Sequence, residues 1–373
     1  MEKQLHIVTH DVPYPVDYGG VFDLFYKIKT LSESGIIIHL HCFEYGRGRQ
    51  PELNKYCASV SYYKRKKINA LFRPSLPYIV SSRINGDLID RLLRDDHPIL
   101  LEGIHCTAIL NDPRFVNRKI LVRLHNVEYL YYAHLSLYEI SFLKKIYYRF
   151  ESRLLQQYEK RLAKNSDYLS VSQQDIQYYE QNLHARNIRY LPVFIGYDRV
   201  ESLVGTGSYC LYHGNLSVAE NQEAAGWLIE KIFDDLRIQL IIAGRNPSAR
   251  LKKLASRSQH TRLIENPTDE EMKQLIRAAQ VNVLPSFNKT GIKLKLINAL
   301  YAGRHCLVNE AAMTDIRFRS ICETADEVNA TKNKLRTLLG IPFTEEMIDR
   351  RKAVLESIFD NNKNGLQLIQ SIW

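Results

Sequence analysis

The sequence lacks the features that mark several classes of protein. Its six cysteines form no Cys-x-x-Cys pair, so their spacing indicates neither a zinc site nor a disulfide framework. No apolar run approaches the roughly 20 residues that a membrane helix needs. The opening residues, MEKQLHIVTHDVP, lack the basic, apolar and small-residue order of a signal peptide. We therefore expect reduced, mostly buried cysteines in a cytoplasmic protein.

Basic residues are present in excess and are unevenly placed. The net charge is +10, and residues 1–200 hold 28 Lys and Arg against 21 Asp and Glu. Basic and aromatic residues interleave in segments 62–78 (YYKRKKINALFRPSLPY) and 142–164 (FLKKIYYRFESRLLQQYEKRLAK). These segments suit an anionic surface such as lipid head groups, or they are a solvated loop and the polar face of a long helix. We expect no nucleic-acid partner, because no recognition motif accompanies the charge.

The remaining sequence alternates between short apolar segments and helical segments, in two successive series. This alternation predicts an α/β fold with parallel sheets covered by helices on both faces. The chain of 373 residues is long enough for two such domains. The predicted strands are 5–10, 36–43, 98–103, 119–125 and 167–172 in the first series, and 208–214, 238–244, 261–266, 281–286 and 305–309 in the second.

The two series join in the glycine-containing segment VFIGYDRVESLVGTGS, residues 193–208, which has no sustained period. We therefore expect two Rossmann-like domains that face each other across a deep cleft. The predicted divisions are an N-terminal domain at 1–195, a linker at 196–207 and a C-terminal domain at 208–354, with a helix at 355–373 crossing back to the N-terminal domain. In such sheets, ligands bind beyond the carboxyl ends of the strands.

A glycine pair follows the first predicted strand in the segment HDVPYPVDYGGVFDLFYKIKTL. Gly19 and Gly20 lead directly into a helix, so backbone N–H groups and the helix dipole point toward the expected cleft. This arrangement suits a diphosphate. A tight turn would need the same two glycines, so the pair alone leaves both interpretations open.

Five segments, in order, resemble the group 1 (family 4) glycosyltransferases of GT-B fold. They are PYPVDYGGVFDLFYKIKTLSESG, LVRLHNVEYLYY, DYLSVSQQD, YHGNLSVAENQEAAGWL and NVLPSFNKTGIKLKLINALYAGRHCLV. The resemblance covers nearly the whole chain. It implies that a sugar is transferred from a nucleotide diphosphate to an acceptor with retention at the anomeric carbon. The N-terminal domain would bind the acceptor and the C-terminal domain would bind the donor.

The resemblance implies three catalytic residues. Positive charge grows on the sugar and negative charge on the leaving diphosphate, so the reaction needs preorganised donors around the phosphates. Lys293 and Lys295 would neutralise the phosphates, provided that the helix begins near them, because on a regular helix they would lie about 200° apart. His125, at the end of a predicted strand, would contact the transferred sugar.

The family pattern also suggests the residues around the two substrates. The sequence departs from it at Asn298, where the family usually has glutamate, and after Gly214, where many relatives have an arginine and then a lysine. Glu102 and His105 also end a strand, so they would line the acceptor pocket or form a buried turn. The predicted donor-binding residues are Gly19, Gly20, Gly214, Asn215, Gly244, Arg245, Thr290, Gly291 and Asn298.

No Asp-x-Asp follows an apolar strand in a nucleotide-binding context, so we expect a metal-independent enzyme. No other cofactor is expected, and the nucleotide-diphosphate sugar enters as a co-substrate. The predicted acceptor is a glycan or a polyprenyl-linked sugar of cell-surface polysaccharide or glycoconjugate synthesis, reached by peripheral contact with the inner face of an anionic membrane. The alternatives are a non-catalytic nucleotide-sugar-binding or scaffold protein, and a hydrolase or epimerase on the same fold.

Overall fold

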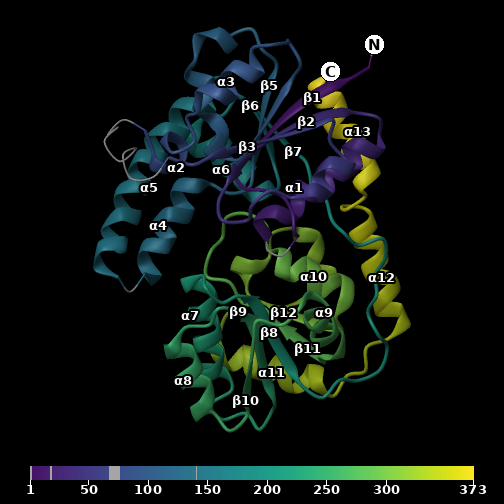
Figure 1. The fold of residues 1–373 in the computed structure, drawn as a ribbon. Coiled ribbons are helices and arrows are strands. Elements are labelled where there is room, and N and C mark those ends of the chain that lie inside the picture. The colour runs from purple at the N-terminus through teal and green to yellow at the C-terminus, as the bar shows by residue number, and fades with distance from the viewer. Residues whose placement is uncertain (1, 17–18, 67–75, 140) are drawn as a thin grey trace.

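Two α/β domains are stacked end to end in the computed structural model of the protein (Figure 1). The structure describes residues 2–16, 19–66, 76–139 and 141–373. Each domain has one sheet covered by helices on both faces, as the alternation of segments predicts. The middle of segment 62–78, residues 67–75, lies outside the described residues.

The N-terminal domain is built on a sheet of parallel strands. Within the described residues the strand order is β3 (Ser59–Lys64), β2 (Ile37–Glu44), β1 (Gln4–Thr9), β4 (Ile99–Glu102), β5 (Ile120–Leu124), β6 (Asp167–Ser170) and β7 (Asn187–Tyr190). The outer strands β3 and β7 were not predicted, because their residues are partly exposed and carry no continuous apolar run. Residues 62–64 of the basic segment therefore belong to an edge strand.

The helices of this domain cover both sheet faces. Helix α1 buries Val21, Leu24, Ile28 and Leu31, which recur at helical spacing along one side. Segment 142–164 is a long helix, and it forms an antiparallel pair with α4 that projects from the body of the domain (Figure 1). The helices are α1 (Gly19–Glu33), α2 (Tyr78–Ser81), α3 (Gly86–Leu92), α4 (Glu128–Tyr138), α5 (Phe142–Ala163) and α6 (Gln173–Leu183).

The C-terminal domain repeats this architecture on a second parallel sheet. Its strand order in the described residues is β10 (Thr261–Glu265), β9 (Leu240–Arg245), β8 (Cys210–Asn215), β11 (Val281–Val283), β12 (His305–Val308) and β13 (Glu323–Thr324). Its helices are α7 (Ala219–Trp227), α8 (Ala249–Arg257), α9 (Asp269–Ala278), α10 (Leu294–Ala302), α11 (Val328–Leu339) and α12 (Glu345–Glu356). The two-residue strand β13 was not predicted.

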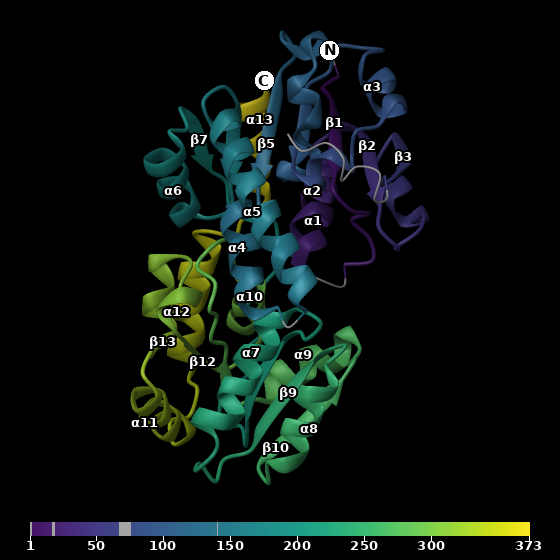
Figure 2. The same cartoon turned by 90° about the vertical axis from the view of Figure 1, so that its left-hand side faces the viewer.

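The last helix, α13 (Asn361–Ile372), returns to the N-terminal domain, where it packs against α1 (Figures 1 and 2). Leu368 and Ile372 are buried in the same cluster as the α1 residues Ile28 and Leu31. At the start of α13, the Asn361 side chain accepts a hydrogen bond from the backbone N–H of Ile195 at 3.0 Å and donates one to its carbonyl at 2.7 Å. The chain therefore crosses between the two domains twice, once between β7 and β8 and once between α12 and α13.

Direct hydrogen bonds also hold the domains together. Asp175, on α6 of the N-terminal domain, accepts a hydrogen bond from the backbone N–H of Gly291 at 3.0 Å. The neighbouring Gln174 donates to the carbonyl of Met313 at 3.0 Å. These contacts bring the carboxyl ends of the strands of both sheets to opposite sides of one cleft.

Candidate active site in the interdomain cleft

A cavity of about 810 Å³ lies between the domains, beyond the carboxyl ends of the strands of both sheets. The N-terminal wall includes Gly20, Asp23 and His125, which come from α1 and from the end of β5. The C-terminal wall includes the ends of β8 and β9 and the start of α10. Most of the predicted site residues line this cavity: Gly20, His125, Gly214, Asn215, Gly244, Arg245, Lys293, Lys295 and Asn298. Gly19 is the first residue of α1, next to Gly20.

Two predicted acceptor residues do not line the cavity. The Glu102 side chain has no exposed surface, so it touches no acceptor directly, and it lies beneath His125 instead. His105 lies in the short helix Ile104–Asn111 that follows β4, with its ring stacked on His10 at 5.1 Å between centroids. Glu102 ends its strand as predicted, whereas His105 lies in the helix beyond that strand. The depth of each side chain depends on neighbouring elements that the sequence pattern does not reveal.

Thr290 and Gly291 also make protein contacts in place of the predicted donor contacts. The Thr290 N–H and hydroxyl both donate to the side-chain oxygen of Asn288 at 2.9 Å. Gly291 has φ +65°, and a Cβ atom there would lie 2.0 Å from the side-chain oxygen of Asn126. Glycine is therefore required where the C-terminal backbone passes over the loop that follows His125.

Buried, paired charges support His125 from below. The Lys27 ammonium lies 2.9 Å from Asp23 Oδ2 and 2.8 Å from Glu102 Oε1, and all three side chains have almost no exposed surface. The Arg123 guanidinium lies 3.2 Å from Asp23 Oδ1 and donates to the carbonyls of Leu191 and Pro192. We call Asp23, Lys27, Glu102 and Arg123 the buried charge network. Its two carboxylates and two cations balance, which reduces the cost of burying them.

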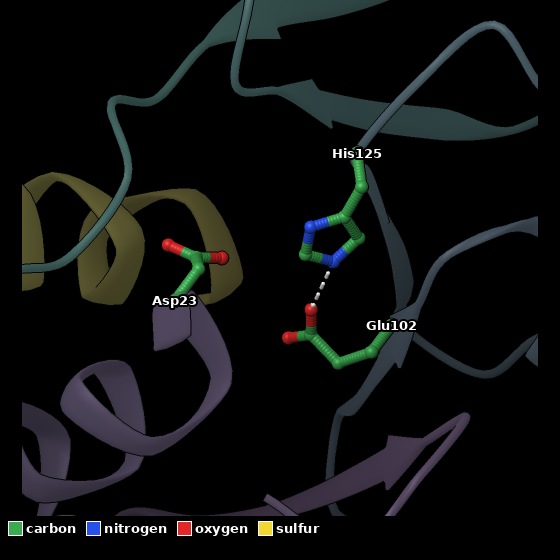
Figure 3. A group of neighbouring side chains, drawn as sticks. All are labelled: Asp23, Glu102 and His125. Carbon is green, nitrogen blue, oxygen red and sulfur yellow. Dashed lines mark hydrogen bonds and ion pairs between the residues drawn. The ribbon is translucent and has the colours of Figure 1, made fainter. Parts of the chain in front are cut away.

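The buried charge network fixes the protonation of the side chain beneath His125. Burial acts to raise the pKa of Glu102, but Lys27 and the hydrogen bond from His125 outweigh it and lower that pKa below its usual value. An ionised carboxylate only accepts hydrogen bonds, so Nε2 of His125 carries the proton that it donates to Glu102 Oε2 at 3.0 Å. Figure 3 shows the other ring nitrogen turned toward the side of Asp23. The hydrogen bond to Glu102 thus fixes the orientation of the ring at the cavity wall.

Asp23, Glu102 and His125 also place one ligand atom each within 4.8 Å of one another, a grouping that suits a metal ion (Figure 3). The Lys27 ammonium already lies against both carboxylates, and Arg123 neutralises Asp23 a second time. A divalent cation would have to enter a site whose negative charge is already balanced. This donor set therefore fits a buried ion-pair network better than it fits a metal centre.

The C-terminal wall presents Lys293 and Lys295 at the start of α10. Helix α10 begins at Leu294, so both lysines stand at its N-terminus, the arrangement that lets both reach one ligand. Lys293 Nζ donates to the Thr290 carbonyl at 2.7 Å. Lys295 Nζ donates to the Tyr212 hydroxyl and to the side-chain oxygen of Asn221, each at 3.1 Å. In the described residues neither lysine has a carboxylate within ion-pair distance.

Burial shifts the titratable groups of this wall, because in the described residues no carboxylate is ion-paired with Lys293, Lys295 or His213. Burial lowers the pKa of Lys295 to about 8, and Glu220 opposes the shift only in part. Burial and the nearby Lys295 charge lower the pKa of His213 to about 3. In the described residues, the buried atoms Asn298 Oδ1 and His213 Nε2 have no hydrogen-bond partner. Most buried polar groups are hydrogen-bonded, so these two are exceptions at a wall whose two lysines suit an anionic ligand.

Sequence reasoning missed the buried charge network. The signal for it was present, because Asp23 and Lys27 are spaced four residues apart in a helix whose neighbouring positions are apolar. Arg123 likewise interrupts the apolar strand KILVRLH. Charged residues on buried strands and helix faces need partners. The pattern does not say which partners they find.

A family model matches most of the C-terminal domain. Residues 207–340 match the family described as "Glycosyl transferases group 1". The chain is also 27% identical over 316 residues to the "Uncharacterized 44.6 kDa protein in cps region" of Klebsiella pneumoniae, covering 79% of each chain.

Solved structures support the same architecture over almost the whole chain. Sucrose-phosphate synthase from Thermosynechococcus elongatus aligns with a TM-score of 0.73 at 14% identity, covering 99% of this chain and 98% of that one. HepE from Anabaena, solved in complex with UDP-glucose, aligns with a TM-score of 0.66 at 12% identity, covering 99% and 98%. The predicted GT-B fold is confirmed, and the match of residues 207–340 to the group 1 family supports the predicted class of enzyme, a glycosyltransferase.

Proposed function

We propose that the protein transfers a sugar from a nucleotide-diphosphate sugar to a glycan or lipid-linked acceptor, with retention and without a metal ion. The observation that carries this proposal is the pairing of the two cleft walls. Lys293 and Lys295, short of counter-charges at the N-terminus of α10, face the same cavity as His125, which is held from below by Glu102. A diphosphate at the lysines would place the sugar toward His125.

The proposed chemistry follows from the charges on the two walls. When the bond from sugar to diphosphate breaks, the leaving oxygen gains negative charge, which Lys293, Lys295 and the N-terminus of α10 stabilise. The sugar would gain positive charge near His125, whose ring is fixed by Glu102. Both effects are strongest in the transition state, so they accelerate transfer more than they strengthen binding.

A screen for donor binding tests this proposal. Thermal unfolding with UDP, GDP and ADP, in the presence of a chelator, should show at least one nucleoside diphosphate that raises the melting temperature. An unchanged melting temperature with all three would contradict the proposed donor site. Transfer assays with the corresponding nucleotide sugars then test turnover.

A non-catalytic nucleotide-sugar-binding protein is the second candidate, favoured by Asn298 at the position of the usual glutamate. Asn298 lines the cavity wall, and a side-chain amide can hydrogen-bond the diol of a ribose. Asn298→Glu should tighten nucleoside diphosphate binding by about tenfold, because a carboxylate accepts stronger hydrogen bonds than an amide. Tighter binding without any turnover in either form would favour the non-catalytic candidate. Weaker binding in the variant would contradict the placement of the ribose.

We further propose that helix α5 brings the protein to the cytoplasmic face of an anionic membrane, where a lipid-linked acceptor lies. Phe142 and Leu143 are 73% and 78% exposed at the start of α5, and Ile146 and Phe150 extend this apolar face along the helix. Basic residues Lys144, Lys145 and Arg149 stand between them, and Arg153 follows on the same helix. This combination suits an interfacial helix. No helix in the described part of the chain is long and apolar enough to span a bilayer.

Liposome flotation tests the membrane proposal. The protein should float with vesicles that contain anionic lipid and should stay at the bottom of the gradient when the vesicles are neutral. The reason is that attraction between basic side chains and anionic lipid strengthens the membrane binding that apolar insertion provides. The double variant Phe142→Ser, Leu143→Ser should lose flotation. A matched change at Val116, which is also exposed but lies away from α5, should not. Equal flotation with both kinds of vesicle would remove the support for an anionic membrane.

A further inference from the structure

The loop between β11 and α10 makes contacts with both domains. Its residues 286–293 (SFNKTGIK) are here called the lysine loop, because they end at Lys293 and lead into Lys295 on α10. The loop contains no helix or strand, and yet three of its polar residues are buried: Ser286, Asn288 and Thr290. Buried polar groups outside regular secondary structure need hydrogen-bond partners from elsewhere in the fold.

Glu220, on α7 of the C-terminal domain, binds the first half of the lysine loop. Its Oε1 accepts a hydrogen bond from the Ser286 hydroxyl at 2.8 Å and another from the backbone N–H of Asn288 at 3.2 Å. The Asn288 side-chain oxygen accepts the two hydrogen bonds from Thr290, and the Thr290 carbonyl accepts one from Lys293 Nζ at 2.7 Å. A continuous series of hydrogen bonds therefore leads from the Glu220 carboxylate to the Lys293 ammonium.

Asp175, on α6 of the N-terminal domain, binds the second half of the lysine loop. This residue is buried, and its Oδ2 accepts a hydrogen bond from the backbone N–H of Gly291 at 3.0 Å. At the same point the loop lies against the end of β5, since a Cβ atom on Gly291 would lie 2.7 Å from the carbonyl oxygen of His125. The lysine loop therefore meets the N-terminal domain directly beside the residue proposed to act on the reacting sugar.

Helix α4 of the N-terminal domain supplies two more contacts across the domain boundary. The Phe287 ring of the lysine loop stacks on Tyr138 of α4 at 6.3 Å between centroids, and it makes an edge-to-face contact with Trp227 of α7 at 6.1 Å. His134 Nε2, also on α4, lies 3.9 Å from Glu220 Oε2. The conformation of the lysine loop therefore depends on groups from both domains.

We propose that Asp175 and Glu220 are positioning residues, which fix the lysine loop so that Lys293 and Lys295 are placed to bind the donor phosphates. Neither carboxylate lines the cavity, so each acts through the loop and not on the ligand. Because one carboxylate comes from each domain, donor binding by the C-terminal domain depends on its contact with the N-terminal domain. The inference rests on the proposed function and adds two residues to its donor site.

Hydrogen exchange of the ligand-free protein tests whether the two carboxylates fix the loop. The Gly291 amide should exchange at least about tenfold faster in Asp175→Ala, and the Asn288 amide should do so in Glu220→Ala, because each amide loses its hydrogen-bond acceptor. Asp175→Asn and Glu220→Gln should restore most of the protection, since a side-chain amide oxygen still accepts from an N–H group. Unchanged exchange at both amides in the alanine variants would overturn the proposal.

Donor affinity tests the consequence for the lysines. Calorimetry with UDP, GDP and ADP should show that the nucleoside diphosphates that bind the parent bind Asp175→Ala and Glu220→Ala about threefold to tenfold more weakly, the effect of losing one or two hydrogen bonds. The Asn and Gln variants should recover most of this affinity. Glu180→Ala on α6 and Glu223→Ala on α7, at exposed positions of the same helices, are the matched controls and should bind like the parent.

A pH profile separates Glu220 from a merely structural role. Burial lowers the pKa of Lys295 to about 8, the Glu220 charge opposes this shift, and Lys293 adds to it. The titratable side chains of β8 beside Lys295 are neutral at pH 7, because burial raises the pKa of Tyr212 and lowers that of His213 to about 3. In Glu220→Gln the pKa of Lys295 should fall further, so nucleoside diphosphate affinity should decline at a lower pH than in the parent. An unmoved profile would contradict the role of Glu220.

The two proposals fail in distinguishable ways. If a nucleoside diphosphate binds the parent and both alanine variants equally well, the positioning inference falls and the proposed donor site stands. If no nucleoside diphosphate binds the parent, the proposed function falls, and the exchange rates of the ligand-free protein still decide whether Asp175 and Glu220 fix the lysine loop.

Discussion

The two walls of the cleft solve the problem of burying charge in opposite ways. On the N-terminal wall, Asp23, Lys27, Glu102 and Arg123 pair with one another and hold His125 in a fixed orientation. On the C-terminal wall, Lys293 and Lys295 have only neutral partners. The first wall has balanced charges, whereas the lysines of the second wall have no paired carboxylate among the described residues. This difference supports the proposed roles of His125 at the reacting sugar and of the lysines at the phosphates.

We expect the largest effect from removing one charge of the buried charge network on the N-terminal wall. Lys27→Met leaves two buried carboxylates against one cation, so we expect the free energy of unfolding to fall by about 3–5 kcal/mol. Without Lys27 the pKa of Glu102 rises, so the loss should shrink as the pH falls through that raised pKa and the carboxyl becomes neutral. Urea denaturation at several pH values measures both effects. Lys29→Met, at a 42% exposed side chain of the same helix, is the control and should change stability by less than about 0.5 kcal/mol.

The next effect concerns the reacting residue. His125→Ala should lower turnover by about 10²-fold or more while donor affinity changes little, because His125 acts on charge that develops in the transition state. Glu102→Gln should lower turnover less, since an amide still holds the ring but carries no charge. Single-turnover rates and donor affinities separate the two effects. Full activity in His125→Ala would exclude its proposed role, and His260→Ala serves as an exposed control.

Substitution of the lysines on the C-terminal wall should change both the affinity for nucleoside diphosphate and the rate of sugar transfer. Lys293→Gln and Lys295→Gln should each weaken nucleoside diphosphate binding by about tenfold or more, because a hydrogen bond to a charged group is worth about 1.5–3 kcal/mol. Turnover should fall too, since phosphate charge grows as the bond breaks. Lys289→Gln, an exposed lysine on the preceding loop, is the matched control. Unchanged affinity in both lysine variants would contradict the proposal that this wall binds the diphosphate.

The smallest expected effect is a pH dependence. The pKa of Lys295 is lowered to about 8, so its ammonium is charged below that pH and neutral above it. Nucleoside diphosphate affinity should therefore fall as the pH rises through 8, by at most about tenfold between about pH 7 and pH 9. Lys295→Arg keeps the charge and should flatten this profile. An unchanged slope in the arginine variant would assign the titration to another group.

The sequence predicted most of the fold because parallel strands buried on both faces appear as short apolar runs between helices. The outer strands β3, β7 and β13 were not predicted, because edge strands are partly exposed and lack continuous apolar runs. For the candidate site, the pattern identified the residues at strand ends and at the start of α10. It could not distinguish Gly20, which lines the cavity, from Glu102, which is buried beneath His125.

By itself, the sequence determined the two α/β series, the join between them and the position of the lysines at a helix start. These properties depend on local periodicity and on residues adjacent in the chain. Only the tertiary structure decided which charges meet. Lys27 pairs with Glu102, and the Gly291 N–H bonds to Asp175 of the other domain, although in each case the partners lie on different elements that are far apart in the sequence. Pairing of buried charges depends on distances across the core, and those distances are set by how the helices and sheets pack.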